Sequence, residues 1–189
     1  MSRPNDGVSN TEVPEVLAID APDAQLALEA LSREVRTAQL ATVDREGLPE
    51  VSYSPFVPQA DGRLLIYVSA LAKHTGNLHQ LPVASLMLVE DETHAATLYA
   101  RRRATWRCTV DPIARDDAAF GHHMSEFRER FGPIIDELAK LRDFRLLALT
   151  PGKGRLVLGF GAAFALDGWT VQALVRGRHR SESEKPANP

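Results

Sequence analysis

The sequence is poor in the residues that would cross-link a protein, anchor it in a membrane or give it a strong charge. Its 189 residues include one cysteine, which excludes an intramolecular disulfide and a cysteine-rich zinc site. No apolar run approaches the roughly 18 residues of a membrane-spanning helix, and the N-terminus lacks the basic and apolar regions of a secretory signal. The net charge of −3, from 22 basic and 25 acidic residues, gives no indication of nucleic-acid binding. We therefore expect a cytoplasmic protein that binds neither membrane nor nucleic acid.

The composition itself is that of an ordinary globular protein. Hydrophobic residues make up 44% and charged residues 25% of the chain, and a domain of this length buries about 70% of its unfolded surface. The first residues are rich in Ser, Asn, Pro and Gly and the last nine are similar, which predicts little order at either end. We predict a disordered segment at 1–19, one folded domain at 20–166 and a C-terminal tail at 167–189.

Short β-rich segments separated by turn residues dominate the folded part. Turn-forming stretches at 44–47 (DREG) and 59–62 (QADG) predict hairpins, and the fifth segment alternates apolar with polar residues. The predicted strands are Thr37–Val43, Glu50–Val57, Leu64–Ser69, Val83–Glu90, Arg103–Val110, Phe144–Thr150 and Arg155–Phe164, the last two meeting at a PGKG turn. This pattern indicates an α+β domain built on an antiparallel barrel of six to seven strands with helices packed outside it.

Three helical pieces are predicted around these strands. Asp20 fits the N-cap of a helix that runs to about Glu34. A polar, helix-like insert, Leu71–Gln80, follows the third strand. Further on, apolar residues recur at spacings of three and four, which predicts a long amphipathic helix that Gly132-Pro133 must kink or split.

Some apparent motifs lack the context that their chemistry needs. The adjacent His122 and His123 point about 100° apart on a helix, so they are poorly placed to share one metal ion. Cys108 lies on the apolar face of its strand, where a buried and unreactive thiol is expected. GFGAAF at 159–164 lies within a predicted strand, whereas a dinucleotide-binding glycine motif opens a helix.

The segment at 69–78 (SALAKHTGNL) carries more chemistry. It gathers hydroxyls, a cation, an imidazole and an amide where a strand ends and a helix begins, which suits a phosphate group. These residues are Ser69, Lys73, His74, Thr75 and Asn77. The run Arg101–Arg103 provides the cations for the second half of an anion clamp. The alternative is a capped helix beside a solvated basic strand end.

The basic run Arg176–Arg180 contains a second candidate, His179. A histidine on a basic tail is usually solvated. It can also act as a mobile ligand arm, because neutral imidazole binds iron well and a tail can close over a bound cofactor.

Several separate motifs, in a consistent order, are similar to those of one superfamily. They are SYSPF at 52–56, LAKHTGNL at 71–78, LVEDE at 88–92, ARRRAT at 100–105 and DFRLLALTPGKGRLVLGFGAAF at 143–164. From about Asp23 to Leu166 the sequence resembles the pyridoxamine 5′-phosphate oxidase-like, FMN-binding split-barrel superfamily, and within it the haem-utilisation (HugZ-type) branch. The resemblance implies a split β-barrel homodimer whose ligand sites lie at the subunit interface.

The resemblance also implies roles for particular residues in two alternative sites. In flavin-binding relatives, the positions of Ser69, Lys73, Thr75 and Arg103 hold the FMN phosphate, with Ala41 and Thr42 near the flavin ring. His74 is then a further phosphate donor, and Asn77 belongs to the same segment. In haem-degrading relatives, the position of His179 supplies the axial ligand of the iron and Asp143 supports it across the dimer interface. Arg178 is then a partner for the haem propionates.

The function implied first is binding and oxidative breakdown of haem, with release of iron and electrons from an external donor. The alternatives are an FMN-dependent oxidoreductase acting on a small substrate and a haem or flavin carrier without turnover.

Overall fold

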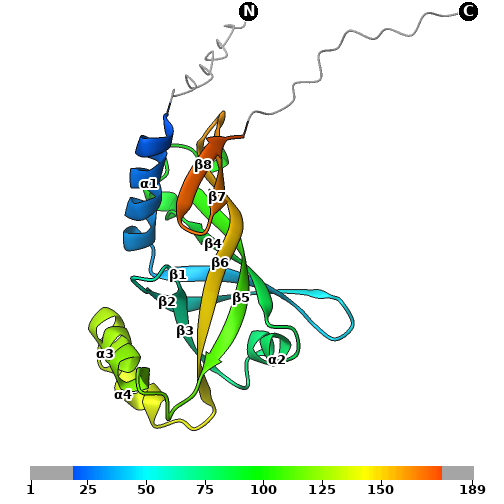
Figure 1. The fold of residues 1–189 in the computed structure, drawn as a ribbon, viewed down its shortest axis with the longest axis vertical. Coiled ribbons are helices and arrows are strands. Elements are labelled where there is room, and N and C mark those ends of the chain that lie inside the picture. Colours follow the sequence, from blue (N-terminus) through cyan, green and yellow to red (C-terminus); the bar gives the residue numbers. More distant parts are fainter. Residues whose placement is uncertain (1–18, 176–189) are drawn as a thin grey trace, which may run out of the picture.

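The structure, a computed structural model, describes residues 19–175. Its centre is an antiparallel sheet in the order β3-β2-β1-β4-β5-β6-β7-β8, and an additional pairing of β3 with β6 closes six of these strands into a barrel (Figure 1). The strands are β1 Thr37–Val43, β2 Pro49–Pro58, β3 Leu64–Ser69, β4 Val83–Val89, β5 Arg103–Ile113, β6 Phe144–Gly159, β7 Ala162–Asp167 and β8 Thr170–Leu174. The predicted α+β barrel with outer helices is confirmed.

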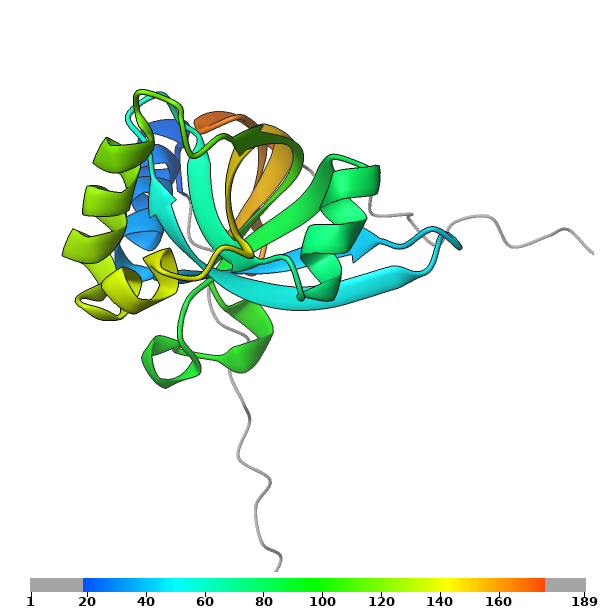
Figure 2. The same ribbon diagram turned by 90° about the horizontal axis from the view of Figure 1, so that it is seen from below.

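The helices lie outside the barrel, where Figure 2 shows α3 and α4 on one side and α2 on the other. Helix α1 spans Ala21–Glu34, and the Asp20 carboxylate caps it by accepting a hydrogen bond from the Asp23 amide at 2.9 Å. The other helices are α2 Lys73–Gln80, α3 Phe120–Phe131 and α4 Ile134–Ala139, with short 3₁₀ turns η1 Glu92–His94 and η2 Leu98–Ala100. The break between α3 and α4 falls at Gly132-Pro133, as predicted.

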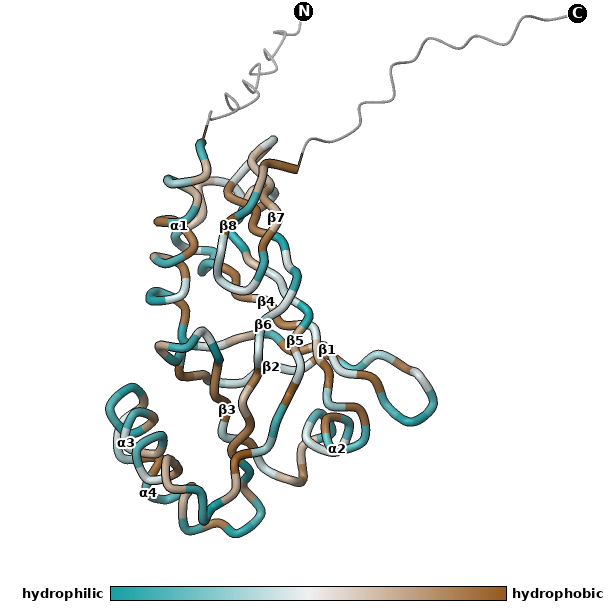
Figure 3. Tube along the Cα trace, viewed as in Figure 1, coloured by the Kyte–Doolittle hydropathy of each residue, from teal (hydrophilic) through white to brown (hydrophobic). Residues whose placement is uncertain are grey.

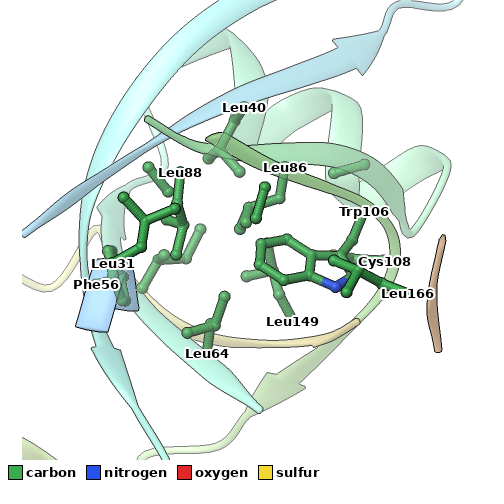
Figure 4. Packing of buried hydrophobic residues seen from close by; sticks show 14 of the residues in the cluster. Leu31, Leu40, Phe56, Leu64, Leu86, Leu88, Trp106, Cys108, Leu149 and Leu166 are labelled. Carbon is green, nitrogen blue, oxygen red and sulfur yellow. The ribbon is translucent and has the colours of Figure 1, made fainter. Parts of the chain in front are cut away.

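The barrel interior is filled by leucines and aromatic side chains, which Figure 4 shows converging from opposite strands. Trp106 is the largest of them; it is 2% exposed, and its indole N–H donates to the Gly168 carbonyl at 2.7 Å. Strand β3 is buried on both faces, and most of it is brown in Figure 3. Its Leu65 and Tyr67 pack outward against Phe127 of α3 and Ile135 of α4. The continuous apolar run of β3 thus follows from a helical cover on its outer side.

The predicted PGKG turn is wrong, because this segment lies inside the single long strand β6. Trp106 of β5 is paired with Gly154 and Cys108 with Pro151, so that two residues of β6 oppose Arg107 in a β-bulge. A proline is tolerated in a bulge, where its missing N–H interrupts no regular ladder. The real turn lies at Phe160-Gly161, where Gly161 has a φ of 72°. The GFGAAF motif is therefore the tip of the β6–β7 hairpin.

The folded part also extends past residue 166, where the sequence placed the start of the tail. Strand β8, Thr170–Leu174, pairs with β7 and packs against α1. The Gln25 side-chain oxygen on α1 accepts a hydrogen bond from the Val171 amide at 2.9 Å, and the Gln25 amide donates to the Trp169 carbonyl at 3.0 Å. These contacts join β8 to the barrel domain. The predicted disordered segment falls almost wholly outside the described residues.

Candidate functional site: a carboxylate beside an apolar cleft

Two residues that the sequence assigned to different ligands meet at the end of strand β3. The Ser69 hydroxyl donates to Asp143 Oδ2 at 2.6 Å. The backbone amide of Ala70 donates to the Asp143 carbonyl at 2.8 Å, because Asp143 immediately precedes β6, which pairs with β3. The sequence predicts Ser69 at a phosphate and Asp143 beside an iron ligand. In the structure the two residues form one half-buried, hydrogen-bonded pair.

Two other residues of the predicted phosphate cluster fasten α2 to the barrel. The Thr75 hydroxyl donates to the Ser69 carbonyl at 2.7 Å, and the Asn77 amide donates to the Thr42 hydroxyl at 3.0 Å. Thr42, Thr75 and Asn77 are all buried. Their polar groups are thus used within the fold, although none of them caps α2, whose N-cap residue is Ala72 and whose N-terminus has no side-chain cap.

The predicted cations do not converge on this cluster within one chain. Lys73 is largely exposed, with its ammonium 3.5 Å from Glu50 Oε2. Arg103 is the first residue of β5, whereas Ser69 lies near the other end of that strand. The last residue of β5, Ile113, pairs with Leu146 of β6, and Ser69 pairs with Phe144 of the same strand. Ten residues of strand separate the two ends of β5, about 33 Å. Lys73 and Arg103 of one chain therefore do not contact the same small anion.

The same cluster does not fit an FMN phosphate. Ser69 and Thr75 already donate their hydroxyl hydrogens to protein acceptors, and the carboxylates of Asp143 and Glu50 add negative charge among the expected donors. A phosphate dianion needs free donors and net positive charge. Burial lowers the pKa of His74, so its imidazole is neutral and adds no cation. Its Nε2 is buried and has no hydrogen-bond partner among the described residues.

An apolar cleft of about 550 Å³ opens beside the Ser69–Asp143 pair. It lies between α2 and the adjoining ends of β5 and β6, and its volume suits a small-molecule ligand. Its lining residues are Ala70, Thr75, Gly76, Leu78, His79, Pro82, Val110, Pro112, Arg145 and Leu147. The walls are thus largely hydrophobic, with an imidazole and a guanidinium as the prominent polar groups.

Sequence reasoning missed Arg145 as a site residue. Its guanidinium donates to the carbonyls of Arg142 and Phe144, and it forms no ion pair among the described residues. The available signal was its position in the sequence, because Arg145 is the second residue of the predicted strand Phe144–Thr150 and lies close to Asp143 in the chain.

Ala41 and Thr42, expected near a flavin ring, line a different cleft of about 630 Å³. This second cleft crosses β1, β4, β5 and β6 and includes Arg107, Cys108 and Lys153. Burial raises the pKa of the Cys108 thiol to about 12, which disfavours the reactive thiolate form at neutral pH. The predicted burial of this thiol is confirmed.

Arg178 and His179, the remaining predicted site residues, lie outside the described residues. The number of residues beyond Val175 nevertheless limits how far either of them can lie from the end of the described chain. The Val175 amide donates to the Ala163 carbonyl, and Ala163 pairs with Val157. Fourteen residues along β6 separate Val157 from Asp143, about 46 Å of strand, whereas four residues beyond Val175 span at most about 14 Å. Val175, the last described residue, therefore lies farther from Asp143 of the same chain than four extended residues can span.

Other site types receive no support from the part of the chain that the structure describes. Residues 19–175 contain no group of three histidine, cysteine or acidic side chains arranged to hold a metal ion. His123, a residue of α3, is instead buried, with Nδ1 3.1 Å from Glu126 Oε2, while His122 is exposed. None of the described helices is long and apolar enough to span a membrane.

Together, the closed six-stranded barrel and the helices around it define a split-barrel protein, and an apolar cleft of small-molecule size opens at the rim of its barrel. The chain belongs to the pyridoxamine 5′-phosphate oxidase family, whose sequence model matches residues 25–158.

Among its relatives, the chain is 41% identical over 141 residues to heme oxygenase HutZ of Vibrio cholerae serotype O1, covering 75% of this chain and 80% of HutZ. A crystal structure of HutZ from Vibrio cholerae, described there as a heme storage protein, superposes with a TM-score of 0.66 at 40% identity over 71% of this chain and 93% of that one. Campylobacter jejuni ChuZ gives a TM-score of 0.77 at 28% identity over 86% of this chain and 67% of that one.

Proposed function

We propose that this protein binds haem as a substrate and degrades it oxidatively, releasing iron. The observation that carries the proposal is the Asp143 carboxylate, held by Ser69 near an apolar cleft that Arg145 lines. A carboxylate in this setting can orient an imidazole iron ligand, and the cleft walls suit a porphyrin. The similarity to HutZ, which is called a heme oxygenase, supports the same conclusion.

Each residue then has a defined task toward the porphyrin. The apolar walls of the cleft exclude water from the macrocycle, and Arg145 pairs with a propionate through a charge-assisted hydrogen bond. Arg178 serves as a second propionate partner. His179 coordinates the iron, and Asp143 accepts the N–H of that imidazole, which fixes its orientation and raises its basicity. Bound haem supplies the redox chemistry at its iron, and dioxygen and an external electron donor complete the reaction.

The arrangement requires two copies of the chain, since His179 cannot reach its own Asp143. We propose a homodimer in which each site takes Asp143 from one chain and His179 from the other. The outer faces of β1, β2 and β4 suit the contact, because they expose apolar side chains without a cover among the described residues. These are Val43, Val51, Tyr53 and Val83. We place this dimer in the cytoplasm, where Cys108 remains a free thiol.

Storage of haem without turnover is a second candidate, favoured by the description of the HutZ structure as a storage protein. Both functions predict stoichiometric binding, and they differ after reductant and oxygen are added. An enzyme loses the Soret band and releases iron, whereas a storage protein keeps its spectrum.

The proposal is tested by titrating the purified full-length protein with haem and following the Soret band. We expect a sharp, shifted band at one haem per chain, followed by bleaching and iron release with ascorbate and air. His179→Ala should lose the shift, because the iron loses its protein ligand. The matched control is His79→Ala, which removes the histidine that lines the described cleft and should keep the shift. A protein that carries flavin absorption and ignores haem, or a shift that depends on His79, would contradict the proposal.

A further inference from the structure

We propose that Ser69 is a positioning residue for the haem reaction, which orients the Asp143 carboxylate toward the iron-ligating imidazole of the second chain. This inference rests on the proposed function. Its basis is the 2.6 Å hydrogen bond from the Ser69 hydroxyl to Asp143 Oδ2. This separation is that of a strong, charge-assisted bond between a hydroxyl and a carboxylate.

The surrounding hydrogen bonds determine the direction of the Ser69 hydroxyl. The Leu71 amide donates to Ser69 Oγ at 3.1 Å, so the oxygen already accepts on one side. A serine hydroxyl has a single hydrogen to donate, and here that hydrogen is committed to Asp143. Ser69 thus cannot rotate away without leaving the carboxylate oxygen or the Leu71 amide unpaired.

The backbone around the pair is held as firmly as the side chains. The Thr75 hydroxyl donates to the Ser69 carbonyl at 2.7 Å, and the Ala70 amide donates to the Asp143 carbonyl at 2.8 Å. Strand β3, helix α2 and the start of β6 therefore meet at this point with fixed spacing.

One carboxylate oxygen of Asp143 stays available in this arrangement. Oδ2 accepts from Ser69, while no residue between 19 and 175 donates to Oδ1. Asp143 is half-buried and precedes the first residue of β6, so its carboxylate would be free to rotate without Ser69. By holding Oδ2, Ser69 presents Oδ1 to the N–H of an incoming imidazole. The Ser69 hydroxyl, which was expected to bind a phosphate, therefore binds the Asp143 carboxylate.

The test compares the Fe–His stretching band in resonance Raman spectra of the ferrous haem complexes of wild type, Ser69→Ala, Ser69→Thr and Asp143→Asn. That band responds to hydrogen bonding at the ligand N–H, which a merely structural role of Ser69 would not change. We expect Ser69→Ala to shift the band in the same direction as Asp143→Asn and to lower haem turnover roughly tenfold. Ser69→Thr keeps the hydroxyl and should restore the wild-type band.

Ser32→Ala provides the matched control, because the Ser32 hydroxyl makes a comparable bond to the Glu29 carbonyl at 2.8 Å on α1, away from the cleft. It should keep the wild-type band. A wild-type band position in Ser69→Ala, or a shift opposite to that of Asp143→Asn, would overturn the role of Ser69 while leaving haem binding intact. If the wild-type complex itself shows no Fe–His band, the proposed function fails and this inference fails with it.

Discussion

A dimer that combines one Asp143→Asn chain with one His179→Ala chain is expected to degrade haem at about half the wild-type rate, because one of its two equivalent sites is intact. Each variant alone should be nearly inactive. Loss of the carboxylate partner of a metal-bound histidine lowers activity about 10–100-fold, and loss of His179 removes the iron ligand. Recovery on mixing therefore distinguishes sites shared between chains from sites within one chain.

The geometry of β6 is the reason for this expectation. The strand runs along most of the length of the molecule, with Asp143 before its first residue and Val157 near its other end (Figure 1). Val175 lies close to that other end of β6, because its amide donates to the Ala163 carbonyl of β7 and Ala163 pairs with Val157. The few residues between Val175 and His179 are too short to return along β6, so the proposed site requires its two side chains to come from different chains.

The experiment uses chains with two different affinity tags, and the mixed dimer is isolated through both. Its activity is measured as the rate of Soret loss. A mirror-image control pairs a wild-type chain with a chain that carries both substitutions. Shared sites predict low activity for this control, because each site then contains one substitution. A control at half the wild-type rate, with no recovery in the mixed dimer, would show that each site is built from one chain.

Replacing Gly154 by Ala is expected to lower the free energy of unfolding by about 3 kcal/mol, because the added methyl group overpacks the bulge between β5 and β6. A Cβ at this position would lie 2.6 Å from Cδ1 of Trp106 and would also collide with the Thr105 carbonyl oxygen. Trp106 has little room to yield, since it is almost fully buried and hydrogen-bonded to Gly168. The measurement is equilibrium unfolding in urea.

The control for this substitution is Gly159→Ala in the same strand. A Cβ at Gly159 would meet no atom within 4 Å, so the change in unfolding free energy should stay within about 0.5 kcal/mol. Equal stability of the two variants would contradict the close approach of Gly154 to β5.

Most of the strands and helices could be predicted from local sequence. The turn residues at 44–47 and 59–62, the Asp20 cap and the Gly132-Pro133 break act over a few neighbouring residues, so their effect is visible without the fold. The PGKG segment was misread for the opposite reason. Its composition is that of a turn, but pairing with β5 on one side and β7 on the other holds it extended. Such pairing depends on residues distant in the sequence.

The candidate site divides in the same way. The sequence by itself determined which chemical groups are present at 69–78, at Asp143 and at His179, and the motif resemblance indicated their ligand classes. Only the tertiary structure decided how these groups combine. Ser69 and Asp143 are 74 residues apart and meet because β3 pairs with β6 to close the barrel. The same barrel places Arg103 and the end of β8 far from that pair. Both lie near the opposite end of β6, and the length of β6 is greater than a short tail can span.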